Sequence, residues 1–225
     1  MNYEKDVFLL TQRQLAQYWG VTADFTDYRD ETIERVRRCF QLRSGKYYSI
    51  DKYPYLSVLN TVHYSIFLYF LSNTIFKAGG DPELCAMVFY LNKILHSVDW
   101  YYEVDLPAIF CAEHPLGSVM GKAVYSDHFF FYQGCTVGGS NKKYPHIGRG
   151  VVMYSNSSIL GNCTIGNHVI LGAGTLVKNE DIPSNSLVFG QSPHLSIVFK
   201  DEAYILSKLS HFWISMPAGQ TDAAQ

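Results

Sequence analysis

Apolar residues recur every six positions through the middle of this chain, and few folds produce such a period. They stand at Tyr125, Phe131 and Val137, and after four extra residues the spacing resumes at Ile147, Met153, Ile159, Ile165, Leu171 and Val177. A helix repeats every ~3.6 residues and a half-buried strand every two, so neither explains the period. Six-residue units are typical of a β-helix, in which stacked coils share one core. The spacing predicts a β-helix in preference to an ordinary β-meander.

The rest of the chain predicts a two-part organisation of the α+β class. Residues 9–18 and 30–42 are amphipathic, with Asp30 as the expected N-cap of the second helix, and Pro82 opens a further apolar helix. From residue 98 onward β-branched residues, glycines and short turns take over. We therefore expect a helical domain over 1–97 and a β-helix domain over 98–198. A short closing helix and a flexible tail are expected within 199–225.

Composition excludes several classes of protein. The net charge of −2 gives no electrostatic basis for binding nucleic acid. Five scattered cysteines without a CxxC pair favour neither a disulfide framework nor a zinc site, and no metal is expected. The first residues carry mixed charge and no long apolar run, which is not typical of a signal peptide. We expect a protein of the reducing cytoplasm.

One uncharged stretch, residues 54–76, is long enough to span a bilayer. It contains Asn60, His63 and Asn73, which would be costly at membrane depth and would be spread around the helix. A buried or oligomer-facing core helix is therefore favoured over membrane contact.

Three motifs link residues 98–198 to a known family. They are QGCTVGG at 133–139, ILGN at 159–162 with LGAGT at 171–175, and DIP at 181–183 with FGQSP at 189–193. Together they resemble the serine acetyltransferase branch of the hexapeptide-repeat acyltransferases. The resemblance implies a left-handed parallel β-helix behind a helical N-terminal domain, and a reaction in which acetyl-CoA is the acyl donor.

The resemblance also implies a catalytic pair. His114 lies nineteen residues before Gln133, and Asp99 lies fifteen residues before His114. Transfer of an acyl group from a thioester to a hydroxyl needs a base near neutral pH, which suits His114. A carboxylate such as Asp99 would hold the imidazole in the correct tautomer. Glu113 stands where the family has an acidic residue that contacts substrate.

Departures from the family pattern concern the acceptor. Tyr144 replaces a second active-site histidine, Lys143 replaces an arginine, and His146 matches a lysine of the family motif. Tyr47 stands where serine acetyltransferases carry an aspartate. An amino acid needs a carboxylate for its ammonium group and a cation for its carboxylate, whereas tyrosines suit a sugar ring. The substitutions therefore favour a sugar.

The resemblance assigns the donor site to the groove between adjacent β-helices. Backbone groups near Gly139, Ser140, Ser155 and Ala173 match positions that line it, Gly139 could donate to the oxyanion, and Lys178 could meet a phosphate of CoA. A shared groove implies a homotrimer, and by analogy the helical domain would join two trimers into a hexamer. Serine acetyltransferases dock on cysteine synthase through a C-terminal isoleucine, and this sequence ends in glutamine, so that partner is not expected.

These features favour an acetyl-CoA-dependent O-acetyltransferase acting on a hydroxyl of a sugar or surface glycan. Two alternatives stay open. The first is a serine O-acetyltransferase of cysteine biosynthesis; the second is an inactive β-helix that serves as an assembly module. An amino sugar would make the enzyme an N-acetyltransferase, and the Asp99 and His114 pair is compatible with that reaction.

Overall fold

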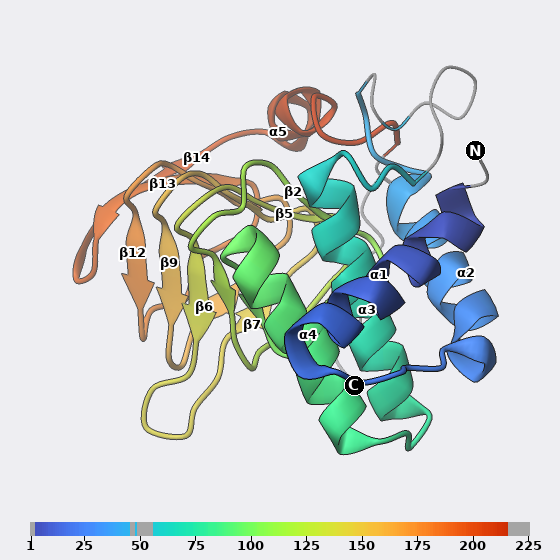
Figure 1. Cartoon of the computed structure of the whole chain (residues 1–225). Helices are drawn as coiled ribbons and strands as arrows, with labels where there is room; N and C mark the ends of the chain where they lie inside the picture. The colour runs from blue at the N-terminus through green and yellow to red at the C-terminus, as the bar shows by residue number, and fades with distance from the viewer. Residues whose placement is uncertain (1–2, 46–47, 49–55, 216–225) are drawn as a thin grey trace.

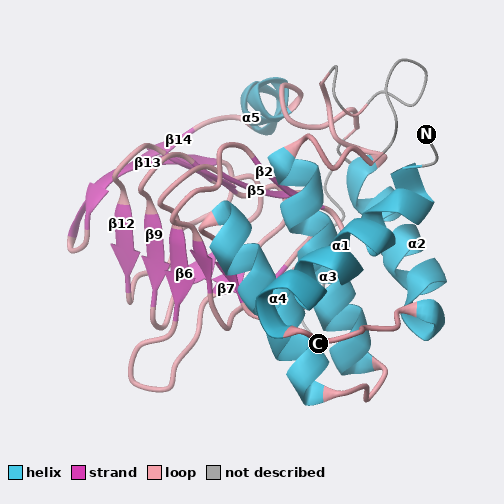
Figure 2. Cartoon of the chain, viewed as in Figure 1, coloured by secondary structure: helices cyan, strands magenta, loops and turns pink. Residues whose placement is uncertain are grey.

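The computed structural model describes residues 3–45, 48 and 56–215. A group of helices lies beside a stack of short parallel strands (Figures 1 and 2). The helices are α1 (Tyr3–Trp19), the 3-10 turn η1 (Thr26–Tyr28), α2 (Arg29–Phe40), α3 (Thr61–Lys77), α4 (Pro82–His96) and, after the strands, α5 (Glu202–Leu209).

Local capping explains where the helices begin. Asn60 accepts hydrogen bonds from the backbone N–H groups of Val62 and His63 at the start of α3. Asp81 accepts from the N–H of Glu83 at the start of α4, where Pro82 occupies the first turn. The prediction that Asp30 caps α2 is wrong, because the helix begins one residue earlier behind Tyr28, which makes no side-chain cap.

The apolar stretch becomes α3, the central helix of the helical half. Residues 63–75 of this helix are all buried. Asn73 donates to the carbonyl of Tyr102 at 2.6 Å and accepts from Arg35 at 2.6 Å, so its polarity is satisfied inside the protein. In the described part of the chain, no helix is both long and apolar enough to cross a membrane.

The strands form a β-solenoid with three faces. The first face contains β1 (Asp99–Trp100), β3 (Val119–Met120), β6 (Thr136–Gly138), β9 (Ser158–Leu160) and β12 (Leu176–Lys178). The second contains β2 (Phe110–Ala112), β5 (Phe129–Phe131), β8 (Val152–Met153), β11 (Ile170–Leu171) and β13 (Ser186–Gln191). The third contains β4 (Val124–Tyr125), β7 (His146–Ile147) and β10 (Thr164–Ile165). Within each face, these strands pair in parallel.

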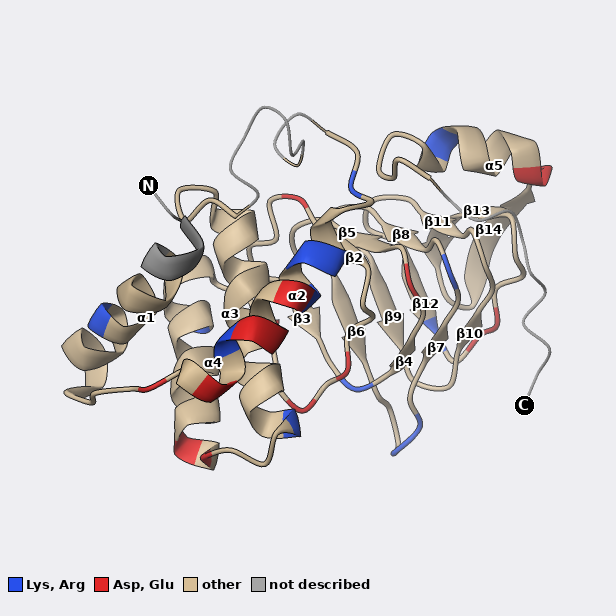
Figure 3. Ribbon diagram, turned by 90° about the vertical axis from the view of Figure 1, so that its right-hand side faces the viewer, with Lys and Arg blue, Asp and Glu red and all other residues tan. Residues whose placement is uncertain are grey.

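The predicted period is the core of this solenoid. Side chains at the repeat positions from Phe131 to Val177 are at most 2% exposed, and Tyr125 at the first coil is half-buried. The four extra residues form a loop between β6 and β7 that projects beyond the strands in Figure 1. Ser140 and Lys143 exchange two backbone hydrogen bonds across it. Charged residues lie mainly on the helices and on the turns between strands (Figure 3).

The C-terminal part contains two features beyond the predicted closing helix. After β13 the chain turns back as β14 (His194–Phe199), which pairs antiparallel with β13. After α5, residues 212–214 run beside residues 42–44, which follow α2. Ser44 N–H donates to the Phe212 carbonyl and Ile214 N–H donates to the Leu42 carbonyl, both at 2.9 Å. We call residues 212–214 the C-terminal clasp.

Candidate active site

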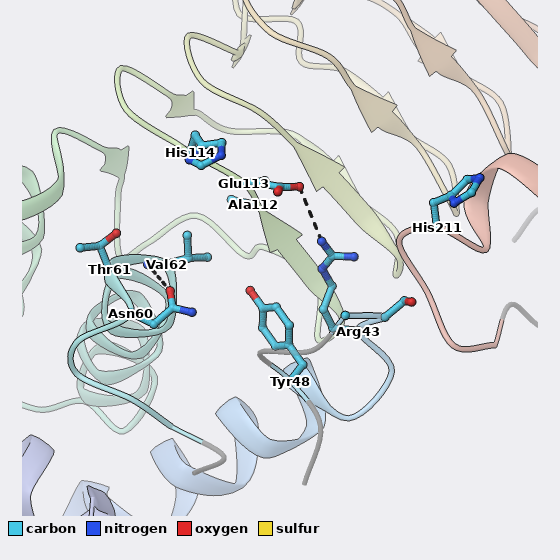
Figure 4. Close-up of a pocket in the computed structure, with 11 residues that line it drawn as sticks. Arg43, Tyr48, Asn60, Thr61, Val62, Ala112, Glu113, His114 and His211 are labelled. Atoms are coloured by element: carbon cyan, nitrogen blue, oxygen red, sulfur yellow. Dashed lines mark hydrogen bonds and ion pairs between the residues drawn. The ribbon is translucent and has the colours of Figure 1, made fainter. Parts of the chain in front are cut away.

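A pocket of about 470 Å³ opens where the helical half meets the solenoid (Figure 4). It is lined from the helical half by Arg43, Ser44, Gly45, Tyr48, Asn60, Thr61 and Val62, from the turn after β2 by Ala112, Glu113 and His114, and from the C-terminal segment by His211. A histidine and a carboxylate at the mouth of a pocket are the kind of groups that carry out proton transfer.

His114 is held at a turn of the solenoid with its side chain exposed. Its backbone has a φ of 50°, in the left-handed region, and its carbonyl accepts from Leu116 N–H at 2.8 Å. The preceding residue, Glu113, donates its N–H to the Phe131 carbonyl at 3.0 Å, which fixes this turn on the next coil. The imidazole is therefore open to solvent on a rigid backbone.

Asp99 lies beside that turn without bonding to His114. Asp99 N–H donates to the Ser118 carbonyl at 2.9 Å, so β1 runs next to the segment that follows His114. The Asp99 carboxylate accepts from Lys93 Nζ at 2.7 Å, and no hydrogen bond joins it to His114 among the described residues. This ion pair is partly exposed, which makes it weak and exchangeable. The catalytic pairing of Asp99 and His114 stays a prediction.

The charges inside the pocket are already paired. The Arg43 guanidinium is 8% exposed and lies 3.8 Å from the Glu113 carboxylate (Figure 4). Arg43 Nη1 donates to the Phe212 carbonyl at 2.7 Å, and the guanidinium lies over the Phe130 ring at 4.8 Å. Arg43 is thus held in place, and the half-exposed Glu113 carboxylate faces this fixed cation.

Arg43 was not predicted from the sequence as a site residue. Tyr47 was predicted and lies outside the described residues, whereas its neighbour Tyr48 lines the pocket. The Tyr48 hydroxyl lies 3.3 Å from Cys111 Sγ, and burial raises the pKa of Tyr48 well above its usual value, so it stays neutral. No local pattern marks Arg43, because its burial depends on Phe130 and Phe212 from distant parts of the chain.

The other predicted site residues fall at two different corners of the solenoid. The His114 corner joins the second face to the first. Backbone hydrogen bonds from Gly134 N–H to the Leu116 carbonyl and from Gly174 N–H to the Ser155 carbonyl, both at 2.9 Å, align its turns. Ser155 and the neighbouring Ala173 therefore share this corner with His114.

The Tyr144 corner joins the first face to the third. Gly139, Ser140, Lys143 and Tyr144 belong to the projecting loop; His146 follows on β7, and Lys178 ends β12. The Tyr144 ring packs so closely on Gly139 that a Cβ there would lie 2.6 Å from it. These residues lie at a different edge of the solenoid from His114, so a single chain does not bring them together with it.

The described residues hold no group of three or more His, Cys, Asp or Glu side chains that could bind a metal ion.

Comparisons with known proteins agree with this architecture. The family described as bacterial transferase hexapeptide (six repeats) matches residues 144–179. The candidate colanic acid biosynthesis acetyltransferase WcaB of Escherichia coli (strain K12) is 33% identical over 121 residues, which are 50% of this chain and 74% of that protein. The chain belongs to the serine acetyltransferase-like hexapeptide-repeat acyltransferases. The resemblance predicted from the motifs is thereby confirmed.

The chain is also similar to serine acetyltransferases. That of Synechococcus elongatus is 32% identical over 114 residues, 48% of this chain and 46% of the relative, so the matched segment spans less than half of that protein. The serine acetyltransferase structure from Brucella abortus superposes with a TM-score of 0.66 at 22% identity, covering 84% of this chain and 82% of that one. A serine acetyltransferase in complex with CoA gives 0.63 at 18%, covering 77% and 72%. The two structures show that the fold is shared.

Proposed function

We propose that this acyltransferase transfers an acetyl group from acetyl-CoA to a hydroxyl of a sugar or surface glycan. The observation that carries the choice of acceptor is the Arg43–Glu113 pair. An amino-acid acceptor needs a free carboxylate for its ammonium group, and Glu113 is the one acidic residue among the described residues that line the pocket. Because Arg43 already lies 3.8 Å from Glu113, an ammonium group would have to share this carboxylate with a buried cation, and the pocket suits a neutral, hydroxyl-bearing acceptor better.

His114 acts as the general base in this proposal. The acceptor oxygen attacks the thioester carbonyl as the imidazole takes the hydroxyl proton. The tetrahedral intermediate then expels the CoA sulfur, which receives that proton, leaving an acetyl ester and CoA. Asp99 would give up its exposed contact with Lys93 and orient the imidazole instead.

A second copy of the chain would complete the donor site. Ser155 and Ala173 lie at the His114 corner, and Gly139, Ser140 and Lys178 at the Tyr144 corner, so a groove between two copies can use one corner from each. This supports a homotrimer with acetyl-CoA bound between subunits. One solved structural neighbour is a serine acetyltransferase in complex with CoA. A CoA donor and five free, buried cysteines favour the cytoplasm.

A thiol-release assay with acetyl-CoA tests the proposal, with L-serine and a panel of sugars, nucleotide sugars and oligosaccharides as acceptors. We expect release with a saccharide, reduced about 10²–10⁴-fold in His114→Ala because the general base is lost. His194→Ala, an exposed histidine on β14, is the matched control and should keep full activity.

Two results would contradict the proposal. Release with L-serine alone would make the chain a divergent serine acetyltransferase, the function after which several of its relatives are named. No release with any acceptor would favour the inactive assembly module.

A further inference from the structure

A row of outward-facing side chains continues from the pocket along the second face of the solenoid. Glu113, Tyr132 and Tyr154 each follow the last residue of a strand, β2, β5 and β8 respectively. Those last residues pair in parallel register, Ala112 with Phe131 and Phe131 with Met153. The three side chains therefore occupy the same position in successive coils.

The two tyrosines of this row point away from the core. Phe131 and Met153 are fully buried inside the solenoid, and neighbouring residues of a strand point to opposite sides. The rings of Tyr132 and Tyr154 stack with centroids 5.2 Å apart and planes at 14°. We call this pair the tyrosine ladder.

Neighbouring aromatic rings fix the ladder from the side of the C-terminal clasp. Phe130 lies 5.2 Å from Tyr132, and Phe212 of the clasp lies 6.4 Å from Tyr154, measured between ring centroids. Tyr154 keeps 38% of its surface exposed. A supported aromatic surface loses little conformational freedom when it binds a ligand.

The ladder offers both polar and apolar groups. Glu113, which precedes it in the row, lines the pocket. Each tyrosine also carries a hydroxyl, and burial and the nearby Glu113 carboxylate raise the pKa of Tyr132 to about 12. Tyrosine combines an apolar ring with a hydroxyl, and a sugar ring has an apolar face and a polar edge. Adjacent coils are ~4.8 Å apart, so each step along the solenoid is comparable to one sugar unit of an extended glycan.

We propose that the tyrosine ladder binds further sugar units of an oligosaccharide whose acetylated unit lies in the pocket beside His114. This rests on the proposed function, and it narrows the acceptor from a sugar to a chain of sugars. Glu113, which lines the pocket, precedes the ladder by one coil in the same row, so one extended ligand can contact both.

The test measures saccharide binding without acetyl-CoA, so that it is independent of the transfer reaction. An array of defined oligosaccharides of one to six units is screened with the full chain, and the best-bound oligosaccharide and its monosaccharide are then compared by calorimetry. We expect the oligosaccharide to bind at least about tenfold more tightly. Tyr154→Ala should remove that gain and leave monosaccharide affinity within about twofold.

Two matched variants make the result specific. Tyr154→Phe keeps the ring and should retain most of the gain. Tyr204→Ala removes a tyrosine with the same 38% exposure from α5 and should bind like the unmodified protein. Thermal melting of each variant confirms that it is folded.

Four outcomes would overturn the ladder proposal. They are an absence of preference for oligosaccharides on the array, unchanged binding in Tyr154→Ala, equal losses for monosaccharide and oligosaccharide, and a change of oligomeric state in Tyr154→Ala by sedimentation. The last would make the ladder an interface between copies of the chain. The thiol-release assay decides separately whether any saccharide is acetylated.

Discussion

At the scale of single residues, burial has the largest effect on the titratable side chains of this protein. Arg43 is buried at the junction of the two halves, where aromatic rings, a carbonyl and Glu113 surround it. His63 is buried in less polar surroundings. It is 1% exposed between the rings of Phe40 and Tyr48, and burial lowers its pKa to about 4.

His63 therefore predicts how stability depends on pH. Its Nδ1 accepts the Ser57 N–H at 3.3 Å, which requires a neutral ring. The unfolded state binds a proton near pH 6.5 and the folded state only near pH 4, so stability is full above pH 6.5 and falls as pH drops toward 4. We expect a loss of roughly 1 kcal/mol per pH unit in that window.

Urea unfolding between pH 7.5 and 4.5 measures this slope. His63→Leu should reduce this slope; the remainder comes from His96, whose pKa burial also lowers to about 4, and from His128, whose pKa burial lowers as well. His194→Asn, at an exposed site on β14, should leave the slope unchanged. An equal slope in His63→Leu would contradict the assignment.

At the scale of elements, side-chain caps help to decide where α-helices start. A side-chain cap is present at the start of α4 and absent at the start of α2. Asp81 accepts the Glu83 N–H at 2.9 Å, whereas Asp30 lies within the first turn of α2 and bonds no N–H as a cap. A carboxylate within the first turn still interacts favourably with the helix dipole, but less strongly than a cap.

Asp81→Ala should therefore lower the free energy of unfolding by about 1 kcal/mol, and Asp30→Ala by less than about 0.5 kcal/mol. Both aspartates are exposed and neither lines the pocket, so acetyl transfer should not change. Chemical denaturation of the two variants provides the comparison. Equal losses would show that the Asp81 cap contributes no more than a charge.

The sequence predicted the elements whose signals are local or periodic. The solenoid core from Phe131 to Val177 followed from its spacing, and His114 and Glu113 followed from a motif. The β13–β14 hairpin was missed because it follows the end of the six-residue period and its antiparallel return is not part of that repeat. Arg43 and Tyr132 were missed as site residues because their surroundings come from segments that only the folded chain brings together.

At the scale of the whole molecule, the C-terminal clasp joins the helical half to the solenoid. Trp213 is 1% exposed and its ring lies 5.2 Å from that of His128. The same segment holds Arg43 through the Phe212 carbonyl. Packing of the clasp therefore contributes both to global stability and to the position of Arg43 in the pocket.

Trp213→Ala should destabilise the protein by about 3 kcal/mol or more, because it leaves a large cavity between the clasp and the second face. Ile214→Ala is the control, since Ile214 is 69% exposed and its loss should cost less than about 0.5 kcal/mol. Thermal and urea unfolding of the two variants would show the difference. A Trp213→Ala variant as stable as Ile214→Ala would mean that the clasp is only loosely attached.

The contact between Arg43 and Phe212 spans 169 residues of sequence. Each solenoid coil, by contrast, pairs with a coil made only some twenty residues earlier. During synthesis the solenoid can therefore form coil by coil as it leaves the ribosome. The pocket, by contrast, is complete only after His211 and the clasp have been made. We expect a nascent or prematurely terminated chain to carry a finished solenoid with an unassembled pocket.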